Sequence, residues 1–312
     1  MFVVCGEALM DVFAQSDTST GIALDARVGG SPFNVAVGLA RLQQPVSFFG
    51  AMSRDFLGDR LVRALRDEGV DITPIVRVDA PTTLGLVGIN EQGLPSYTFY
   101  GEGGADRQLR ADALASLPSQ IDAVHIGSYS TVVEPIASTL RALVEREHVR
   151  TMISYDPNVR LNVDSDLARW RSALHWMQPR SHLLKISEED LSLVLPGTSQ
   201  QSFATDALAR GVRLVVVTRG VDGATAWTAT ASVSVSAVPV PVVDTVGAGD
   251  TFQAALLTWL AEHNRLSPQE WGSMPLAQLR DALHFAVRAA SITVSRRGAD
   301  LPRRRELAGS VG

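Results

Sequence analysis

Short, almost wholly apolar runs alternate along most of the chain with longer stretches in which apolar residues recur every three or four positions. The short runs are typical of buried strands and the longer stretches of helices that cover a sheet. We expect strands at residues 2–5, 46–49, 123–127, 151–155, 183–186 and 214–218. We expect helices at 32–42, 55–68, 134–145, 165–176, 188–195, 200–209, 251–262 and 276–295, and a hairpin at 224–240. This alternation predicts an α/β fold with a mostly parallel sheet between two layers of helices.

Two segments do not follow this alternation. Residues 12–28 and 82–104 carry strand-type and turn residues, but no helical pattern connects their strands. We expect them to form a small β appendage inserted in a single domain that spans residues 1–312. Ligands of parallel sheets bind at the carboxyl ends of the strands. The appendage could therefore serve as a lid over that edge.

Composition and charge narrow the class of protein. The hydrophobic share of 46% and the charged share of 20% are ordinary for a globular chain. A net charge of −5 argues against a nucleic-acid or membrane surface. The single cysteine, Cys5, allows no internal disulfide and fits the cytoplasm. We find neither a signal peptide nor a run of about 18 apolar residues, so no transmembrane helix is expected.

Several kinds of site are excluded by the residue inventory. Lys185 is the only lysine, and no Gly-Lys pair exists, which excludes a P-loop. The six histidines show no zinc-like spacing. Arginines gather at positions 296–297 and 303–305, where we expect a solvated basic end, with phosphate contact as the alternative.

The most informative motif is a glycine-rich loop that opens a helix. It reads Asp244-Thr245-Val246-Gly247-Ala248-Gly249-Asp250-Thr251-Phe252. Free N–H groups at a helix start attract anions, and glycines let a phosphate approach the backbone. A carboxylate at Asp250 could take a proton from a hydroxyl that attacks the phosphate; alternatively, it merely caps the helix. We expect the helix start to lower the pKa of Asp250 and keep it ionised.

A second glycine loop opens the first helix, and it reads Gly29-Gly30-Ser31-Pro32-Phe33-Asn34. Capping by Ser31 and a proline at the first helical position explain two of these residues. They do not explain the glycines or Asn34. Asp11 and the segments 156–160 and 218–220 also follow predicted strands. Their shared place beyond the carboxyl ends of strands indicates a functional site.

These motifs together resemble the PfkB (ribokinase-like) carbohydrate kinases. The loop at 244–250 resembles the second signature of that family, and residues 29–36 resemble the first half of its first signature. Three further stretches, at residues 6–11, 156–160 and 185–189, make the chain most similar to fructokinases. The resemblance runs from residue 1 to about residue 302. It implies a three-layer ribokinase-like fold with a β lid, and an ATP-dependent sugar kinase that works with Mg²⁺ and a monovalent cation such as K⁺.

The resemblance also implies roles for individual residues. Asp250 would be the catalytic base, and the amides of Gly247, Ala248 and Gly249 would hold the transferring phosphoryl group. The sugar would be bound by Asp11, Gly30, Asn34, Arg160 and Tyr100. ATP would be bound by Lys185, Thr218, Gly220, Gly223, Ala286, Ala289 and Ala290. Asp190 would act on Mg²⁺ through water, and Asp244 would bind the monovalent cation. Relatives also lead us to expect a homodimer formed through the lid.

One departure concerns the lid. Fructokinase lids often read Phe-Tyr-Arg-Asn-Pro-Ser-Ala-Asp, whereas this chain has Phe99-Tyr100-Gly101-Glu102-Gly103-Gly104-Ala105-Asp106. From this we expect that Gly101→Arg lowers the fructose KM by helping the lid to close.

Several alternatives remain open besides a kinase that converts D-fructose to fructose phosphate. The substrate could be 2-keto-3-deoxygluconate or another sugar. A dinucleotide-binding oxidoreductase would also have Gly247-x-Gly249 after a strand, although Phe252 replaces its third glycine. A third alternative is a non-catalytic sensor of sugar and nucleotide.

Overall fold

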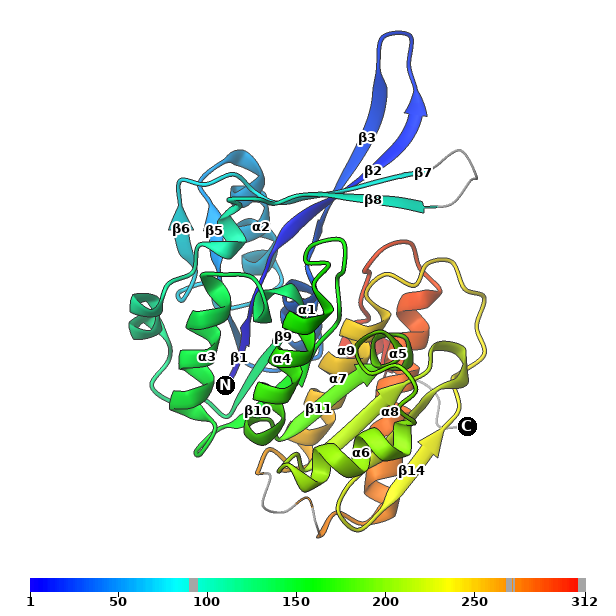
Figure 1. The fold of residues 1–312 in the computed structure, drawn as a ribbon. Helices are drawn as coiled ribbons and strands as arrows, with labels where there is room; N and C mark the ends of the chain where they lie inside the picture. Colours follow the sequence, from blue (N-terminus) through cyan, green and yellow to red (C-terminus); the bar gives the residue numbers. More distant parts are fainter. Residues whose placement is uncertain (90–94, 268–270, 272, 308–312) are drawn as a thin grey trace.

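A computed structural model describes residues 1–89, 95–267, 271 and 273–307. Its main sheet has eight strands in the order β14-β13-β12-β11-β10-β9-β1-β4 (Figure 1). The pairs from β12 to β4 are parallel, while β13 and β14 run antiparallel at one edge. The strands are β1 Phe2–Cys5, β4 Val46–Phe49, β9 Ala123–Gly127, β10 Met152–Asp156, β11 Leu183–Ser187, β12 Leu214–Thr218, β13 Ala224–Trp227 and β14 Ser232–Val235. The predicted mostly parallel sheet is confirmed.

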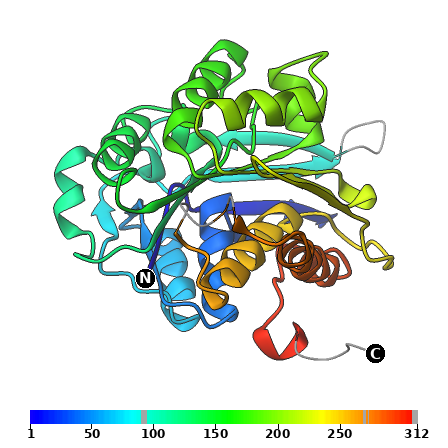
Figure 2. The same cartoon turned by 90° about the horizontal axis from the view of Figure 1, so that it is seen from below.

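Helices cover both faces of this sheet, as the view in Figure 2 shows. The buried apolar residues form two clusters, one on each face. In β1, Val4 belongs to one cluster, and Val3 and Cys5 belong to the other, because successive side chains of a strand point to opposite faces. One layer holds α1 Ser31–Arg41, α2 Phe56–Asp67, α7 Ala248–Glu262 and α8 Leu276–Val294; the other holds α3 Ile136–Glu147, α4 Leu167–Met177, α5 Glu188–Val194 and α6 Gln200–Ala209. The predicted three-layer architecture is thereby confirmed.

A separate four-stranded sheet projects from this body (Figure 1). Its order is β3-β2-β7-β8, with β2 Leu9–Asp17, β3 Ile22–Gly29, β7 Leu84–Ile89 and β8 Pro95–Tyr100. It is the predicted β appendage, and we call it the lid sheet. The pattern did not reveal a small third sheet of β5 Ala51–Ser53 and β6 Val76–Val78.

The last third of the chain differs in one boundary from the sequence expectation: helix α7 begins at Ala248, three residues before the expected start. The basic end is largely solvated, as expected, since Arg297, Arg303 and Arg305 are exposed. It also makes surface ion pairs with the helical layer: Arg303 with Glu68 and Arg304 with Glu262. Helix α9 (Arg304–Leu307) is thereby fastened to the body of the protein. No helix in the described ranges is long and apolar enough to cross a membrane.

Candidate active site

The centre of the site is Asp250, in the first turn of α7. Ser31 Oγ donates a hydrogen bond to Asp250 Oδ1 (2.6 Å), and Asn34 Nδ2 donates one to Oδ2 (2.8 Å). The sequence position of Ser31 suggested that it caps α1, and this is wrong. Gly30 takes the cap position, with φ of 106°. The N-termini of α1 and α7 face each other, and the carboxylate is held between them.

The electrostatics of Asp250 differ from the sequence expectation. Burial raises its pKa, and the hydrogen bonds from Ser31 and Asn34 and the charges of Arg160 and Lys185 lower it by less. The predicted lowering of this pKa is wrong, because loss of water outweighs the field of one helix start. A raised pKa makes Asp250 a stronger proton acceptor than an ordinary aspartate.

The glycine loop beside Asp250 provides amide donors. Gly247 caps α7 in the left-handed conformation, with φ of 78°, and a Cβ there would lie 2.7 Å from the Ala299 Cβ. The Ala248 N–H donates to the Thr245 carbonyl at 3.2 Å. In the described chain, no backbone carbonyl outside the helix accepts from the Gly249 N–H, and Gly249 is exposed. The loop can therefore offer amides to an anion.

On the other side of Asp250 lies Asp11, in lid strand β2. Its carboxylate occupies the space that side chains at Gly29 and Gly85 would fill: a Cβ at Gly29 would overlap Oδ2, and one at Gly85 would lie 2.9 Å from Oδ1. The pKa of Asp11 is raised to about 6. Burial is the main cause; the charge of Arg160 acts to lower this pKa, and the charge of Asp250 acts to raise it. The structure therefore brings Asp11, Asn34, Arg160 and Asp250 together, while their role in binding sugar stays a prediction.

In strand β8, it is Phe99 and not Tyr100 that lies beside this site. Tyr100 pairs with Leu84 across the lid sheet and is 61% exposed. Phe99 pairs with Gly85, and its Cζ lies 3.4 Å from where a Gly85 Cβ would be, which places the ring beside Asp11. Period-2 alternation along β8 sends the two side chains to opposite faces.

Gly101, where the resemblance expects an arginine, is enclosed. A Cβ there would lie 2.8 Å from Thr83 Cγ2 and 3.0 Å from Arg107 Nη2. The geometry thus argues against the expected benefit of Gly101→Arg, because another arginine already fills that space.

The predicted nucleotide residues fall into two groups. Lys185 is buried, and its Nζ donates to Asp156 Oδ2 (2.5 Å) and lies 3.6 Å from where a Gly249 Cβ would be. Thr218 is the last residue of β12, and Gly220 begins the short 3-10 helix that follows it. Thr218 and Gly220 thus lie at the carboxyl end of β12, and Lys185 lies within the neighbouring strand β11.

The other predicted nucleotide residues have structural explanations. A Cβ at Gly223 would overlap the Val235 carbonyl, so the β13–β14 pairing itself requires glycine there. Ala286 and Ala289 are fully buried in the core, and Ala290 alone of the three alanines exposes some surface.

Asp190 and Asp244 can be judged as cation ligands. Burial, and then the charge of Asp156, raise the pKa of Asp190 to about 6, so a cation beside this carboxylate would relieve an electrostatic cost. Asp244 accepts from the Val246 and Gly298 amides (3.1 and 2.8 Å), which fix its carboxylate. Within the described residues, no three His, Cys, Asp or Glu side chains cluster as a metal site. Magnesium would therefore depend on phosphates and water as well as Asp190.

Sequence reasoning missed a buried polar cluster behind the sugar side. Ser130 donates to Glu7, while Thr83 and Tyr129 both donate to Asp106. Burial raises the pKa of Glu7 to about 7. The only signal was Glu7 itself, an acid within an otherwise apolar first segment.

Comparison with known proteins agrees with this geometry. The model of the pfkB family carbohydrate kinases matches residues 1–305. A fructokinase of Rhizobium leguminosarum bv. trifolii is 34% identical over 98% of this chain and 92% of its own length. The Escherichia coli fructokinase is 32% identical over 97% of each.

Solved structures show the same architecture. A Xylella fastidiosa fructokinase with bound ATP has a TM-score of 0.88 at 26% identity, covering 98% of this chain and 96% of that one. A Vibrio cholerae fructokinase, with fructose, ADP and calcium bound, has a TM-score of 0.83 at 27% identity, covering 98% and 97%. The oxidoreductase alternative is therefore wrong. The chain belongs to the pfkB family of carbohydrate kinases and is an ATP-dependent sugar kinase.

Proposed function

We propose that the sugar is D-fructose. The observation that carries the chemistry is Asp250, held by Ser31 and Asn34 at the mouth of an amide-lined loop. The choice of fructose is supported by relatives that carry the name fructokinase. Asp11 supports a polyhydroxylated ligand, because a carboxylate accepts hydrogen bonds from two hydroxyls at once.

In this proposal, Asp11, Asn34 and Arg160 position the sugar so that one hydroxyl faces Asp250. Asp250 takes the hydroxyl proton as the oxygen attacks the terminal phosphorus of ATP and the bond to ADP breaks. The loop amides and Lys185 stabilise the negative charge of the transferring group. A magnesium ion near Asp190 would neutralise phosphate charge, and a monovalent cation near Asp244 would support the loop.

An ADP-release assay over a panel of sugars tests the substrate. We expect a higher kcat/KM for fructose than for 2-keto-3-deoxygluconate. The site already holds the carboxylate of Asp11, and Glu102 lies in the loop after β8, so both disfavour a ligand that carries a carboxylate. A clear preference for the sugar acid would refute the fructose assignment and leave the kinase activity standing.

We further propose that two copies associate through the lid sheet. Ile22, Leu24 and Tyr100 are 61%, 56% and 61% exposed, which is unusual for large apolar residues on one small sheet. Sedimentation of the wild type and of the double variant Ile22→Glu/Leu24→Glu tests this. We expect a dimer that becomes a monomer in the variant. A monomeric wild type at micromolar concentration would refute the proposal.

The cytoplasm remains our proposed location. Its support is the substrate, since ATP is the cytoplasmic phosphoryl donor, and the buried thiol of Cys5, which is free. Fractionation of the producing cells would test it, and recovery outside the cytoplasm would refute it.

A further inference from the structure

The segment that follows the lid sheet folds tightly around Thr83. The Gly104 amide donates to the Gly101 carbonyl and the Ala105 amide to the Pro81 carbonyl, both at 2.9 Å. A side chain at Gly104 would overlap Thr83 Oγ1. This turn brings η1 (Ala105–Arg107) back towards Gly101, so that Arg107 Nη2 lies 3.0 Å from where a Cβ of that glycine would be.

The guanidinium of Arg107 has little to bind there. Its Cζ lies 6.0 Å from the centre of the Tyr129 ring. Its Nε is buried without a hydrogen-bond partner. The neighbouring carboxylate of Asp106 already accepts from Thr83 and Tyr129. Within the described ranges, no carboxylate lies at ion-pair distance from Arg107. The guanidinium is half-buried and keeps N–H donors that a ligand could use.

Aromatic contacts connect this cation to the sugar site. The Tyr129 ring meets Phe99 edge to face, with centroids 6.4 Å apart. Phe99 in turn lies over Gly85, beside the carboxylate of Asp11. A chain of contacts therefore runs from Arg107 through Tyr129 and Phe99 to Asp11. The charge of Arg160, in contrast, reaches both Asp11 and Asp250.

We propose that Arg107 is a specificity-determining residue that donates hydrogen bonds to oxygens of a neutral sugar, at the end remote from the hydroxyl that is phosphorylated. This inference rests on the proposed function, because it takes the surroundings of Asp11 and Asp250 as the sugar site. The surroundings favour a neutral ligand, because Arg107 lies next to the buried carboxyl of Asp106, and Asp11 and Asp250 add two further acidic groups to the sugar site. A hydroxyl can accept from Arg107 without bringing a further negative charge among them.

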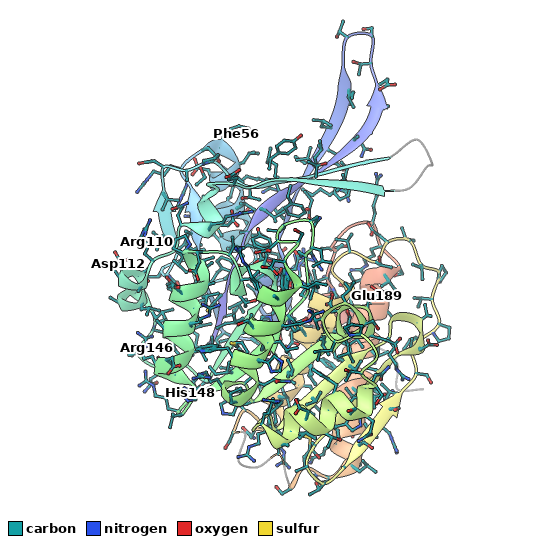
Figure 3. The ribbon with its side chains drawn as sticks, in the orientation of Figure 1. Phe56, Arg110, Asp112, Arg146, His148 and Glu189 are labelled. Carbon is teal, nitrogen blue, oxygen red and sulfur yellow. The ribbon has the colours of Figure 1, made fainter. Side chains whose placement is uncertain are left out.

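The first test replaces Arg107 by methionine, which keeps the length of the side chain and removes its charge. We expect the KM of the preferred neutral sugar to rise about tenfold or more, as for the loss of a hydrogen bond from a charged donor. The KM for ATP stays within about twofold. Arg110→Met is the matched control, because Arg110 is exposed and lies away from the lid on the outer side of the body (Figure 3). An unchanged sugar KM in Arg107→Met overturns the proposal.

The second test uses the space that Gly101 and Arg107 share. Gly101→Arg alone brings a second cation against Arg107, so we expect it to raise the sugar KM. In the double variant Gly101→Arg/Arg107→Met, the guanidinium of residue 107 no longer fills that space. We expect the new arginine to enter it, with the Thr83 methyl turned aside, and to restore part of the sugar affinity that Arg107→Met loses. The two changes therefore compensate each other. Thermal melting checks that the two single variants and the double variant are folded. If their effects on the sugar KM are additive, the argument that residues 101 and 107 share one space is overturned.

The panel of sugars keeps the two proposals distinguishable. If the wild type ignores fructose but phosphorylates another neutral sugar, the fructose proposal fails, and Arg107→Met must still raise the KM of that sugar. If the preferred substrate is a sugar acid and only its KM depends on Arg107, the neutral-ligand inference is overturned.

Discussion

The two aspartates of the site, Asp250 in α7 and Asp11 in the lid sheet, are held in different ways. Both oxygens of Asp250 already accept hydrogen bonds from α1. In the described chain, no group donates a hydrogen bond to the Asp11 carboxylate. This carboxylate instead occupies space that Gly29 and Gly85 leave free. Asp250 is thus oriented before any substrate arrives, whereas Asp11 keeps its acceptor capacity for the ligand. We infer that the first serves the reaction and the second serves binding.

The difference extends to the elements that carry them. Asp250 depends on a contact between residues more than 200 positions apart, made by two helices packed in the core. Asp11 depends on neighbouring strands of a sheet that projects from the body (Figure 1). A buried helix pair fixes geometry closely, while a projecting sheet can move relative to the body.

The largest effect is expected from Asp250→Asn. The amide has nearly the same shape but cannot take a proton, so kcat falls by roughly a hundredfold or more while the sugar KM changes little. Steady-state kinetics and a thermal melt check this, with Ser31→Ala as a milder control that keeps the carboxylate. Near-normal turnover in Asp250→Asn would mean that this residue only supports the helix start.

Asp11→Ala is expected to act on binding instead. The sugar loses a charged acceptor for its hydroxyls, at about 1.5–3 kcal/mol for each hydrogen bond, so its KM rises at least roughly tenfold. The KM for ATP changes little. A similar rise for both substrates would show that Asp11 does not belong to the sugar side.

A smaller effect is expected when only the space around Asp11 is changed. In Gly85→Ala the new methyl lies 2.9 Å from Asp11 Oδ1 and displaces the carboxylate, so the sugar KM rises several-fold with kcat nearly constant. Gly88→Ala is the matched control, because a Cβ at that position of the same strand meets nothing within 4 Å. Equal effects of the two substitutions would show that general loss of lid flexibility, and not Asp11, is responsible.

The sequence predicted much of this comparison, and its errors have physical reasons. The strands, the helical layers, the lid sheet and the meeting of Asp11, Asn34 and Asp250 followed from periodicity and from the rule about strand ends. The pKa of Asp250 was predicted wrongly because burial depends on what packs above a residue, which the local sequence does not state.

Contacts between distant segments were also beyond the sequence. Ser31 has the residue type and position of an ordinary helix cap, and only the fold shows its hydroxyl turned towards Asp250. Gly85 gave no signal, because its role is to leave room for a side chain in a neighbouring strand. Arg107 could not be connected with Gly101, since a tight turn brings together residues that a linear motif treats as separate.

The smallest effect concerns stability, and it distinguishes the two aspartates through pH. Burial raises the pKa of Asp11 from its ordinary 3.8 to about 6, so folding favours the protonated form. Stability is therefore lost as the pH rises from about 4 to about 6, because the folded carboxyl must ionise where charge is disfavoured. Asp11→Asn carries no charge and avoids this loss, which is on the order of 1–3 kcal/mol.

We therefore expect Asp11→Asn to bind sugar poorly and yet melt a few degrees above the wild type at pH 7.5. The difference should disappear near pH 4, where both side chains are neutral. Thermal melts of the two proteins between pH 4 and pH 8 measure it. A wild type that is the more stable protein at pH 7.5 would mean that Arg160 stabilises the ionised Asp11 by more than burial costs. Asp11 would then be held by a partner before the sugar arrives, as Asp250 is, and the contrast between the two sides of the site would fail.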